Sequence, residues 1–119
     1  MAKRSEFVEY LLEQLAPLGT LRAKAMFGGW GIYCDERIFA VVDKDQLYFK
    51  ADAETIPDFT GKGLGPFTYP KKDGTLMSMA YYTAPADALE DQAELLQWAR
   101  AALGVALRAA HAKPPKKKS

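Results

Sequence analysis

The hydrophobic and polar positions near the start of the chain follow the period of an α-helix. Ser5 has a side chain suited to an N-cap, and Pro17 and Gly19 mark the end of the segment. Glutamates occupy one side of this segment and apolar residues the other. The pattern predicts an amphipathic helix of about three turns, whose apolar side consists of Phe7, Val8, Leu11, Leu12 and Leu15.

From residue 21 the period of the pattern changes to that of β-strands. Short runs rich in aromatic and β-branched residues are separated by short acidic turns at residues 35–37 and 43–45. Parallel neighbours would need long crossover connections, so these runs predict an antiparallel meander. The expected strands cover residues 21–27, 30–34, 38–42 and 46–50.

The middle of the chain is broken by prolines and glycines between residues 52 and 66, where 53–59 have room for one helical turn. Residues 67–70 and 75–83 then resemble the two strands of a hairpin. The turn between them, Lys72-Asp73-Gly74, contains the Asp-Gly pair that favours tight hairpins. We therefore expect a closing hairpin at the end of the sheet.

The last helix has the clearest signal in the chain. Asp91 followed by Glu94 matches the capping-box pattern, with Asp in place of Ser or Thr. The residues that follow are acidic early and basic late, as the helix dipole favours. The predicted apolar stripe consists of Leu95, Leu96, Ala99, Ala102, Leu103, Ala106, Leu107 and Ala110.

These elements predict an α+β fold, an antiparallel sheet of five or six strands flanked by an N-terminal helix and a long C-terminal helix. We expect one domain over residues 1–112 and a disordered basic tail over residues 113–119.

Charge is distributed unevenly along the 119 residues. The formal net charge is +1, but residues 113–119 contain four lysines and no acid, so residues 1–112 carry −3. A strong nucleic-acid footprint on the folded body is therefore not expected. The lysines that favour phosphate contact through the tail are Lys113, Lys116, Lys117 and Lys118.

Cys34 is the only cysteine, so no disulfide forms within the chain, and the residue is expected to be a half-buried strand residue. The first residues lack the apolar run of a secretory signal, and no stretch is long enough to span a bilayer. A cytoplasmic protein without membrane contact is expected.

Candidate chemistry is sparse. The cluster Gly28-Gly29-Trp30-Gly31 precedes a strand and not a helix, which favours close approach of a backbone or a ring over phosphate binding. The single histidine, His111, lies on the polar side of the last helix without an orienting partner. We therefore predict no catalytic residues, no metal site and no cofactor. The turn acids Asp35, Glu36, Asp43 and Asp45 are interpreted as turn-capping residues.

The strand region also contains a large share of the aromatic residues. Alternation places some of them on the side away from the helices, where they either pack, face a protein or stack bases. Core packing or a protein-facing surface is the favoured reading, because the body is acidic. These residues are Trp30, Tyr33, Tyr48, Phe67, Tyr69, Tyr81 and Tyr82.

An ordered set of motifs resembles the N-terminal domain of the TfoX/Sxy family. Its main part is Met26-Phe27-Gly28-Gly29-Trp30-Gly31-Ile32-Tyr33, followed by Leu47-Tyr48-Phe49-Lys50. The segment ending in Tyr81-Tyr82 and the sequence from Leu89 to Trp98 continue it in the same order, so the resemblance covers about residues 5–110. The resemblance implies an α+β domain, an association with regulation of natural competence, and no catalytic residues or cofactor. The full-length regulators carry a second, C-terminal domain where this chain has its lysine tail.

Three functional hypotheses follow. The first is a non-enzymatic regulatory adaptor that contacts a protein partner, such as a transcription factor, with the Phe27–Tyr33 hairpin and Tyr81-Tyr82 as its surface or scaffold. The second is direct nucleic-acid binding through the lysine tail and strand aromatics, and the third is a small enzyme. A homodimer formed through an edge strand is also expected to be feasible.

Overall fold

A computed structural model describes residues 6–26, 29–70, 73 and 76–112. Its elements follow the order predicted from the sequence, with six strands between two helices. They are α1 (Glu6–Gln14), η1 (Ala16–Leu18), β1 (Leu21–Met26), β2 (Gly29–Cys34), β3 (Arg37–Asp43), β4 (Gln46–Lys50), α2 (Ile56–Thr60), β5 (Pro66–Pro70), β6 (Leu76–Thr83), η2 (Ala86–Glu90) and α3 (Gln92–Ala112). The α+β class and the antiparallel sheet predicted from the sequence are confirmed. Ser5 and residues 113–119 lie outside the described residues.

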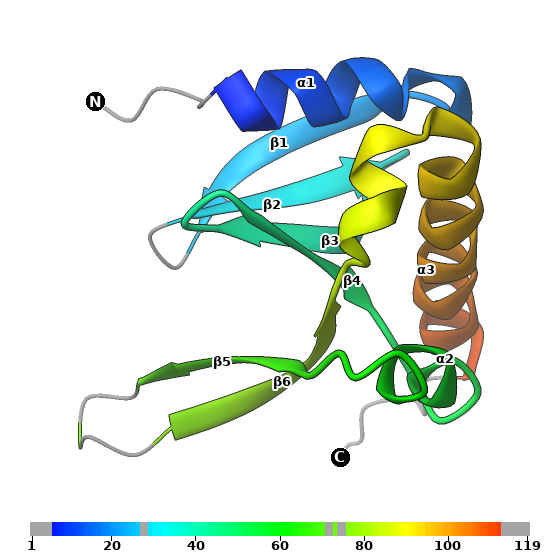
Figure 1. Ribbon diagram of the computed structural model, residues 1–119. Coiled ribbons are helices and arrows are strands. Elements are labelled where there is room, and N and C mark those ends of the chain that lie inside the picture. Colours follow the sequence, from blue (N-terminus) through cyan, green and yellow to red (C-terminus); the bar gives the residue numbers. More distant parts are fainter. Residues whose placement is uncertain (1–5, 27–28, 71–72, 74–75, 113–119) are drawn as a thin grey trace, which may run out of the picture.

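All strand pairs in the sheet are antiparallel, and the strand order is β1-β2-β3-β4-β6-β5. The closing hairpin therefore joins the meander through its second strand, β6, which pairs with β4. This leaves β1 and β5 as the two edges. Figure 1 shows a strongly twisted sheet, with the β5–β6 hairpin extending beyond the part that the helices cover.

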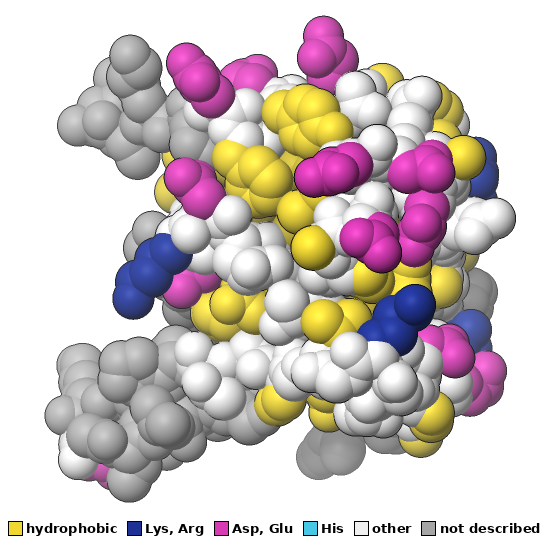
Figure 2. Space-filling view, viewed as in Figure 1, with side chains coloured by type: hydrophobic (Ala, Val, Ile, Leu, Met, Phe, Trp, Pro, Cys, Tyr) yellow, Lys and Arg dark blue, Asp and Glu magenta, His cyan; other side chains and the backbone are white. Residues whose placement is uncertain are grey.

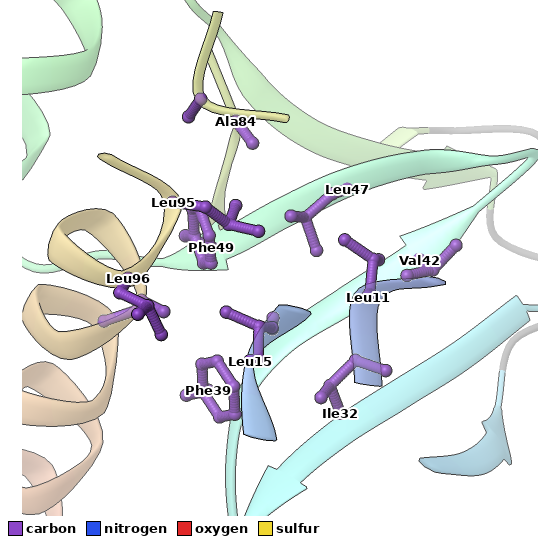
Figure 3. Close-up of a cluster of buried hydrophobic side chains, with 14 of the residues drawn as sticks. Leu11, Leu15, Ile32, Phe39, Val42, Leu47, Phe49, Ala84, Leu95 and Leu96 are labelled. Atoms are coloured by element: carbon purple, nitrogen blue, oxygen red, sulfur yellow. The ribbon is translucent and has the colours of Figure 1, made fainter. Parts of the chain in front are cut away.

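The helices pack on one face of the sheet, α1 against β1 and α3 against β3 and β4. The core lies in this layer, where leucines of α1 and α3 meet the apolar side chains of β2, β3 and β4 (Figure 3). Burial of these side chains is the main source of stability in a domain of this size. Fully buried examples are Leu11, Leu15, Ile32, Phe39, Leu47, Phe49 and Leu95.

A β-bulge in β3 shapes this core. Ile32 pairs with Ala40 and Tyr33 pairs with Ile38, so Phe39 is the extra residue on its strand. Phe39 and Ala40 are both buried in the helix-side core, although strict alternation would send them to opposite faces. The bulge thus adds a large aromatic side chain to the core.

The apolar stripe predicted for α3 is correct in part. Leu95, Leu96 and most of the alanines are buried, but Leu107 is 39% exposed and Val105 is buried instead. The buried stripe toward the C-terminal end of α3 therefore includes Val105 and not Leu107. The side chain of Ala110 lies outside the described residues.

The predicted capping box is only half formed. Asp91 Oδ1 accepts hydrogen bonds from the backbone N–H groups of Ala93 and Glu94, at 3.0 and 3.3 Å, as an N-cap does. The backbone N–H of Asp91 donates to the carbonyl of Ala88 and not to the Glu94 side chain. This hydrogen bond to η2 therefore replaces the bond from the Asp91 N–H to the Glu94 side chain that would complete a capping box.

Two hairpin turns hold non-glycine residues in the left-handed region. Asp35 and Glu36 connect β2 to β3, and Lys44 and Asp45 connect β3 to β4, all with φ between 50° and 70°. Two-residue loops of this kind are type I′ turns, which match the twist of the strands but favour Asn-Gly. The protein therefore carries some backbone strain at both turns.

Replacing Asp45 with glycine is expected to stabilise the domain by about 0.5–1 kcal/mol, because glycine adopts positive φ without a Cβ clash. Urea unfolding followed by circular dichroism measures this change. The same replacement at Asp58, which lies in helix α2, is the control and is expected to lower stability. Destabilisation by Asp45→Gly would contradict the assignment of strain to this turn.

Candidate interaction surfaces

The family motif lies largely in β2, and the structure divides its residues between the two faces of the sheet. Trp30 packs against the helix-side core together with Ile32, while Tyr33 lies on the opposite face, where Lys24 contacts its ring. Nothing is described for the side chain of Met26 or for Phe27 and Gly28. The described part of the motif is thus more scaffold than exposed surface.

The surroundings of Gly29 explain why the family motif has glycine at this position. A Cβ built on Gly29 would lie 2.0 Å from the backbone carbonyl oxygen of Val42 in β3. Nonbonded contacts between carbon and oxygen atoms are far longer than this, so only glycine allows β2 and β3 to approach this closely. The sequence-based interpretation of this glycine, close approach of another backbone, is confirmed.

Tyr81 and Tyr82 are neighbours on β6 and therefore point to opposite faces. Tyr82 lies on the helix side, where Phe59 of α2 stands between it and Trp98 of α3, with ring centroids 5.5 and 4.9 Å away. This stack joins the sheet to both helices. Tyr82 therefore belongs to the scaffold, and only Tyr81 belongs to the other face.

The sheet face opposite the helices carries a second, smaller core. Val41, Phe67 and Tyr81 are buried there, with Ile38 and Tyr48 packed against them, and the rings of Tyr48 and Phe67 are 4.7 Å apart. Phe67 reaches this cluster from edge strand β5, and its ring packs across β6 against Tyr48 of β4. Tyr48, Phe67 and Tyr81 thus pack together, which is one of the two alternatives that the sequence favoured for the strand aromatics.

Burial raises the pKa of the Tyr81 phenol to about 12, from 10.0, and nearby Tyr33 adds to the increase. Ionisation of the phenol is therefore more costly in the folded state than in the unfolded state. Below pH 10 both states hold the proton and Tyr81 adds no pH dependence. Above pH 10 the unfolded phenol loses its proton first, so stability falls as the pH rises toward 12.

We expect Tyr81 to remove roughly 1.4 kcal/mol of unfolding free energy per pH unit across this window. Tyr81→Phe is expected to lack that decline while keeping the ring in place. Urea unfolding of both proteins at pH 9, 10 and 11 measures the difference. Identical pH dependence in the two proteins would contradict the burial of an un-ionised phenol.

Basic side chains of β1 and β4 lie beside this second core. Lys24 Nζ is 5.4 Å from the centre of the Tyr33 ring, and Lys50 Nζ is 5.2 Å from that of Tyr81. These are cation–π distances. Arg22 Nη2 forms an exposed ion pair with Glu36 Oε1 at 2.6 Å.

In the part of the chain that the structure describes, the other residues considered for catalysis or metal binding do not form a common site. Cys34 is fully buried, and the pKa of its thiol is raised by burial and by the charge and hydrogen bond of Asp35, which disfavours the reactive thiolate. Within the described ranges no group of carboxylates, cysteine and histidine has the geometry of a metal site. The side chain of His111 lies outside the described residues.

Two clefts formed by the described residues are lined by neither Cys34 nor the turn acids. One, of about 560 Å³, lies between α2 and the start of α3 and includes Trp98 and Glu94. The other, of about 450 Å³, lies near the end of α3, where Arg108 donates two hydrogen bonds to Asp52 Oδ2. Of the helices that the structure describes, none has the length and apolar character needed to cross a membrane.

A surface that the sequence analysis did not single out lies on the helices, and we call it the acidic helical face. Figure 2 shows acidic side chains gathered over α1, η2 and the start of α3, around exposed hydrophobic groups. Tyr10 is 38% exposed and donates a hydrogen bond to the carbonyl of Leu89, which ties α1 to η2. The exposed or half-buried carboxylates of these three elements, with the adjoining Asp91, are Glu6, Glu9, Glu13, Asp87, Glu90, Asp91 and Glu94.

The chain is similar to known proteins over most of its length. The TfoX N-terminal domain family matches residues 13–106. The protein Sxy of Escherichia coli (strain K12) is 28% identical over 96 residues, which cover 81% of this chain and 46% of that protein. The chain thus spans about half the length of the curated relative that it matches. Because the family match covers most of the chain, this protein belongs to the TfoX N-terminal domain family.

Proposed function

We propose that the protein is a non-enzymatic regulatory module of the competence-regulator type, which acts on transcription through contact with a protein partner. The observation that carries the proposal is the family match over residues 13–106, supported by the likeness to Sxy. The burial of Cys34, the residue with the most reactive side chain, supports a role in binding over one in catalysis.

The acidic helical face is the contact surface that we favour. A large exposed aromatic surrounded by charged groups matches the usual anatomy of a protein interface, with an apolar anchor and a polar rim. Tyr10 has the position of such an anchor, since it lies on the outer side of α1 and is held by Leu89. The surrounding carboxylates favour a partner with a basic surface and accelerate its association.

Crosslinked pull-down from the native cytoplasm, with the full chain as bait, tests this proposal. Tyr10→Ala is expected to reduce capture of the main partner at least tenfold, which corresponds to about 1.4 kcal/mol. Leu107→Ala is the matched control, because Leu107 is similarly exposed but lies near the C-terminal end of α3. Failure to capture any specific partner would overturn the adaptor function, and equal capture by both variants would overturn the choice of surface.

Direct nucleic-acid binding remains a second candidate, supported by the four lysines of residues 113–119. It predicts binding to DNA or RNA that weakens steeply as salt rises and is lost when these residues are deleted. A gel-retardation series at increasing salt measures this. Absence of retardation at low salt would contradict it.

A further inference from the structure

Strand β1 is an edge of the sheet with hydrogen-bonding groups directed outward. Thr20 and Asp35 form a hydrogen-bonded pair, since the Asp35 N–H donates to the Thr20 carbonyl at 2.9 Å. In an antiparallel ladder such pairs alternate, so with the register of β1 and β2 the backbone groups of Leu21, Ala23 and Ala25 point away from β2. Within the described residues no strand pairs with β1 on that side.

The other edge differs from β1 in composition. β5 begins at Pro66 and ends at Pro70, and proline cannot donate a hydrogen bond to an added strand. β1 contains no proline over its six residues. Of the two edges, β1 is therefore the one whose backbone is able to accept a further strand.

The side chains of β1 indicate what kind of strand fits. Arg22 and Lys24 lie on the face opposite the helices, while Leu21 and Ala23 pack against the helix-side core. Lys24 contacts the Tyr33 ring, and among the described residues no carboxylate forms an ion pair with it. An added strand therefore meets the positive charge of Lys24 beside the Arg22–Glu36 ion pair on one face, and apolar side chains on the other.

We infer that β1 accepts an extended segment of a protein partner, in which acidic side chains alternate with apolar ones. Its backbone pairs with Leu21, Ala23 and Ala25, and its carboxylates lie beside Arg22 and Lys24. A second copy fits less well, because two-fold pairing through Ala23 would set Arg22 beside Lys24 of the other copy, and like charges in such positions repel. The inference rests on the proposed function, since it specifies one partner segment of a regulatory adaptor.

The direct test uses a synthetic acetylated peptide of alternating glutamate and valine and the full ¹⁵N-labelled chain. We expect saturable shifts of the β1 amide signals and slower hydrogen exchange at Ala23 and Ala25. A peptide with lysine in place of glutamate is the control and is expected to bind at least tenfold more weakly. Equal binding of both peptides, or binding without protection at Ala23 and Ala25, would overturn the inference.

Two variants of the chain sharpen the test. Ala23→Pro removes an outward-pointing N–H without removing a bond to β2, so it is expected to abolish peptide binding while the domain stays folded. Lys24→Glu is expected to weaken binding at least tenfold, and it remains informative if the proline variant fails to fold. Lys62→Glu, an exposed charge reversal after α2, is the matched control and is expected to have no effect.

The same variants separate this inference from the proposed function. If the pull-down captures a specific partner equally well with the natural chain and with Lys24→Glu, the adaptor function survives and β1 is not its contact. If no partner is captured by either chain but the peptide binds with the expected selectivity, the edge site survives and the adaptor function fails. Light scattering compares the oligomeric state of the natural chain and of Ala23→Pro. If the natural chain dimerises and the variant does not, the edge binds a second copy and the inference is overturned.

Discussion

The Gly29→Ala variant is expected to lose roughly 3 kcal/mol or more of unfolding free energy, at the upper end of the cost of overpacking a tight contact. The added Cβ would lie 2.0 Å from the backbone carbonyl oxygen of Val42, and no side-chain rotation can separate the two atoms, because the backbone fixes the position of each. To relieve the clash, β2 and β3 must separate where Trp30 pairs with Val42. Since small domains have about 5–15 kcal/mol of total stability, much of the margin would be lost.

Urea unfolding monitored by tryptophan fluorescence and circular dichroism measures this loss. Gly65→Ala is the matched control, because a Cβ at Gly65 has no atom within 4 Å and its φ is not positive. We expect that control to change stability by less than about 0.5 kcal/mol. Equal unfolding midpoints for the two variants would show that the close approach of β2 and β3 is not required.

The second large effect is expected at Phe39, the extra residue of the β3 bulge. Its side chain is fully buried in the helix-side core, and Figure 3 shows it beside Leu15 and Ile32. Truncation to alanine leaves a cavity at the junction of sheet and helices, and such changes cost about 3–5 kcal/mol. Phe39→Leu retains most of the apolar volume and is expected to cost less than about 1.5 kcal/mol.

Thermal and urea unfolding of the two Phe39 variants test this prediction. Leu107→Ala is again a suitable control, since a side chain that is 39% exposed has less apolar contact to lose than the fully buried Phe39. A small effect of Phe39→Ala, comparable to that of the control, would mean that the bulge does not direct this ring into the core.

For the candidate surfaces, the sequence indicated which types of residue are involved but not on which face of the sheet their side chains lie. The sequence singled out the motif glycines and aromatics, and Gly29 has the close backbone approach that was expected of it. Whether Trp30, Tyr33, Tyr81 and Tyr82 were surface or scaffold was undecided. Their sides follow from strand register, and register depends on pairing between segments distant in sequence.

The acidic helical face was missed for a related reason. Its carboxylates come from two segments, Glu6–Gln14 and Ala86–Glu94, which are about 80 positions apart in the chain. Each segment alone has the acidic first turn that any helix favours. Only the packing of α1 beside η2, through Tyr10 and Leu89, joins them into one surface.

The sequence by itself determined the class of fold, the order of elements, the antiparallel meander and the family, because local periodicity and turn chemistry depend on neighbours in the chain. The tertiary structure alone decided that β6 pairs with β4, that Phe39 joins Ala40 in the core, and that Val105 replaces Leu107 on the buried side of α3. Each of these depends on how segments that are distant in the sequence pair or pack, as in the bulge of β3. Such features arise when distant segments pack to fill a shared core, and no local pattern encodes them.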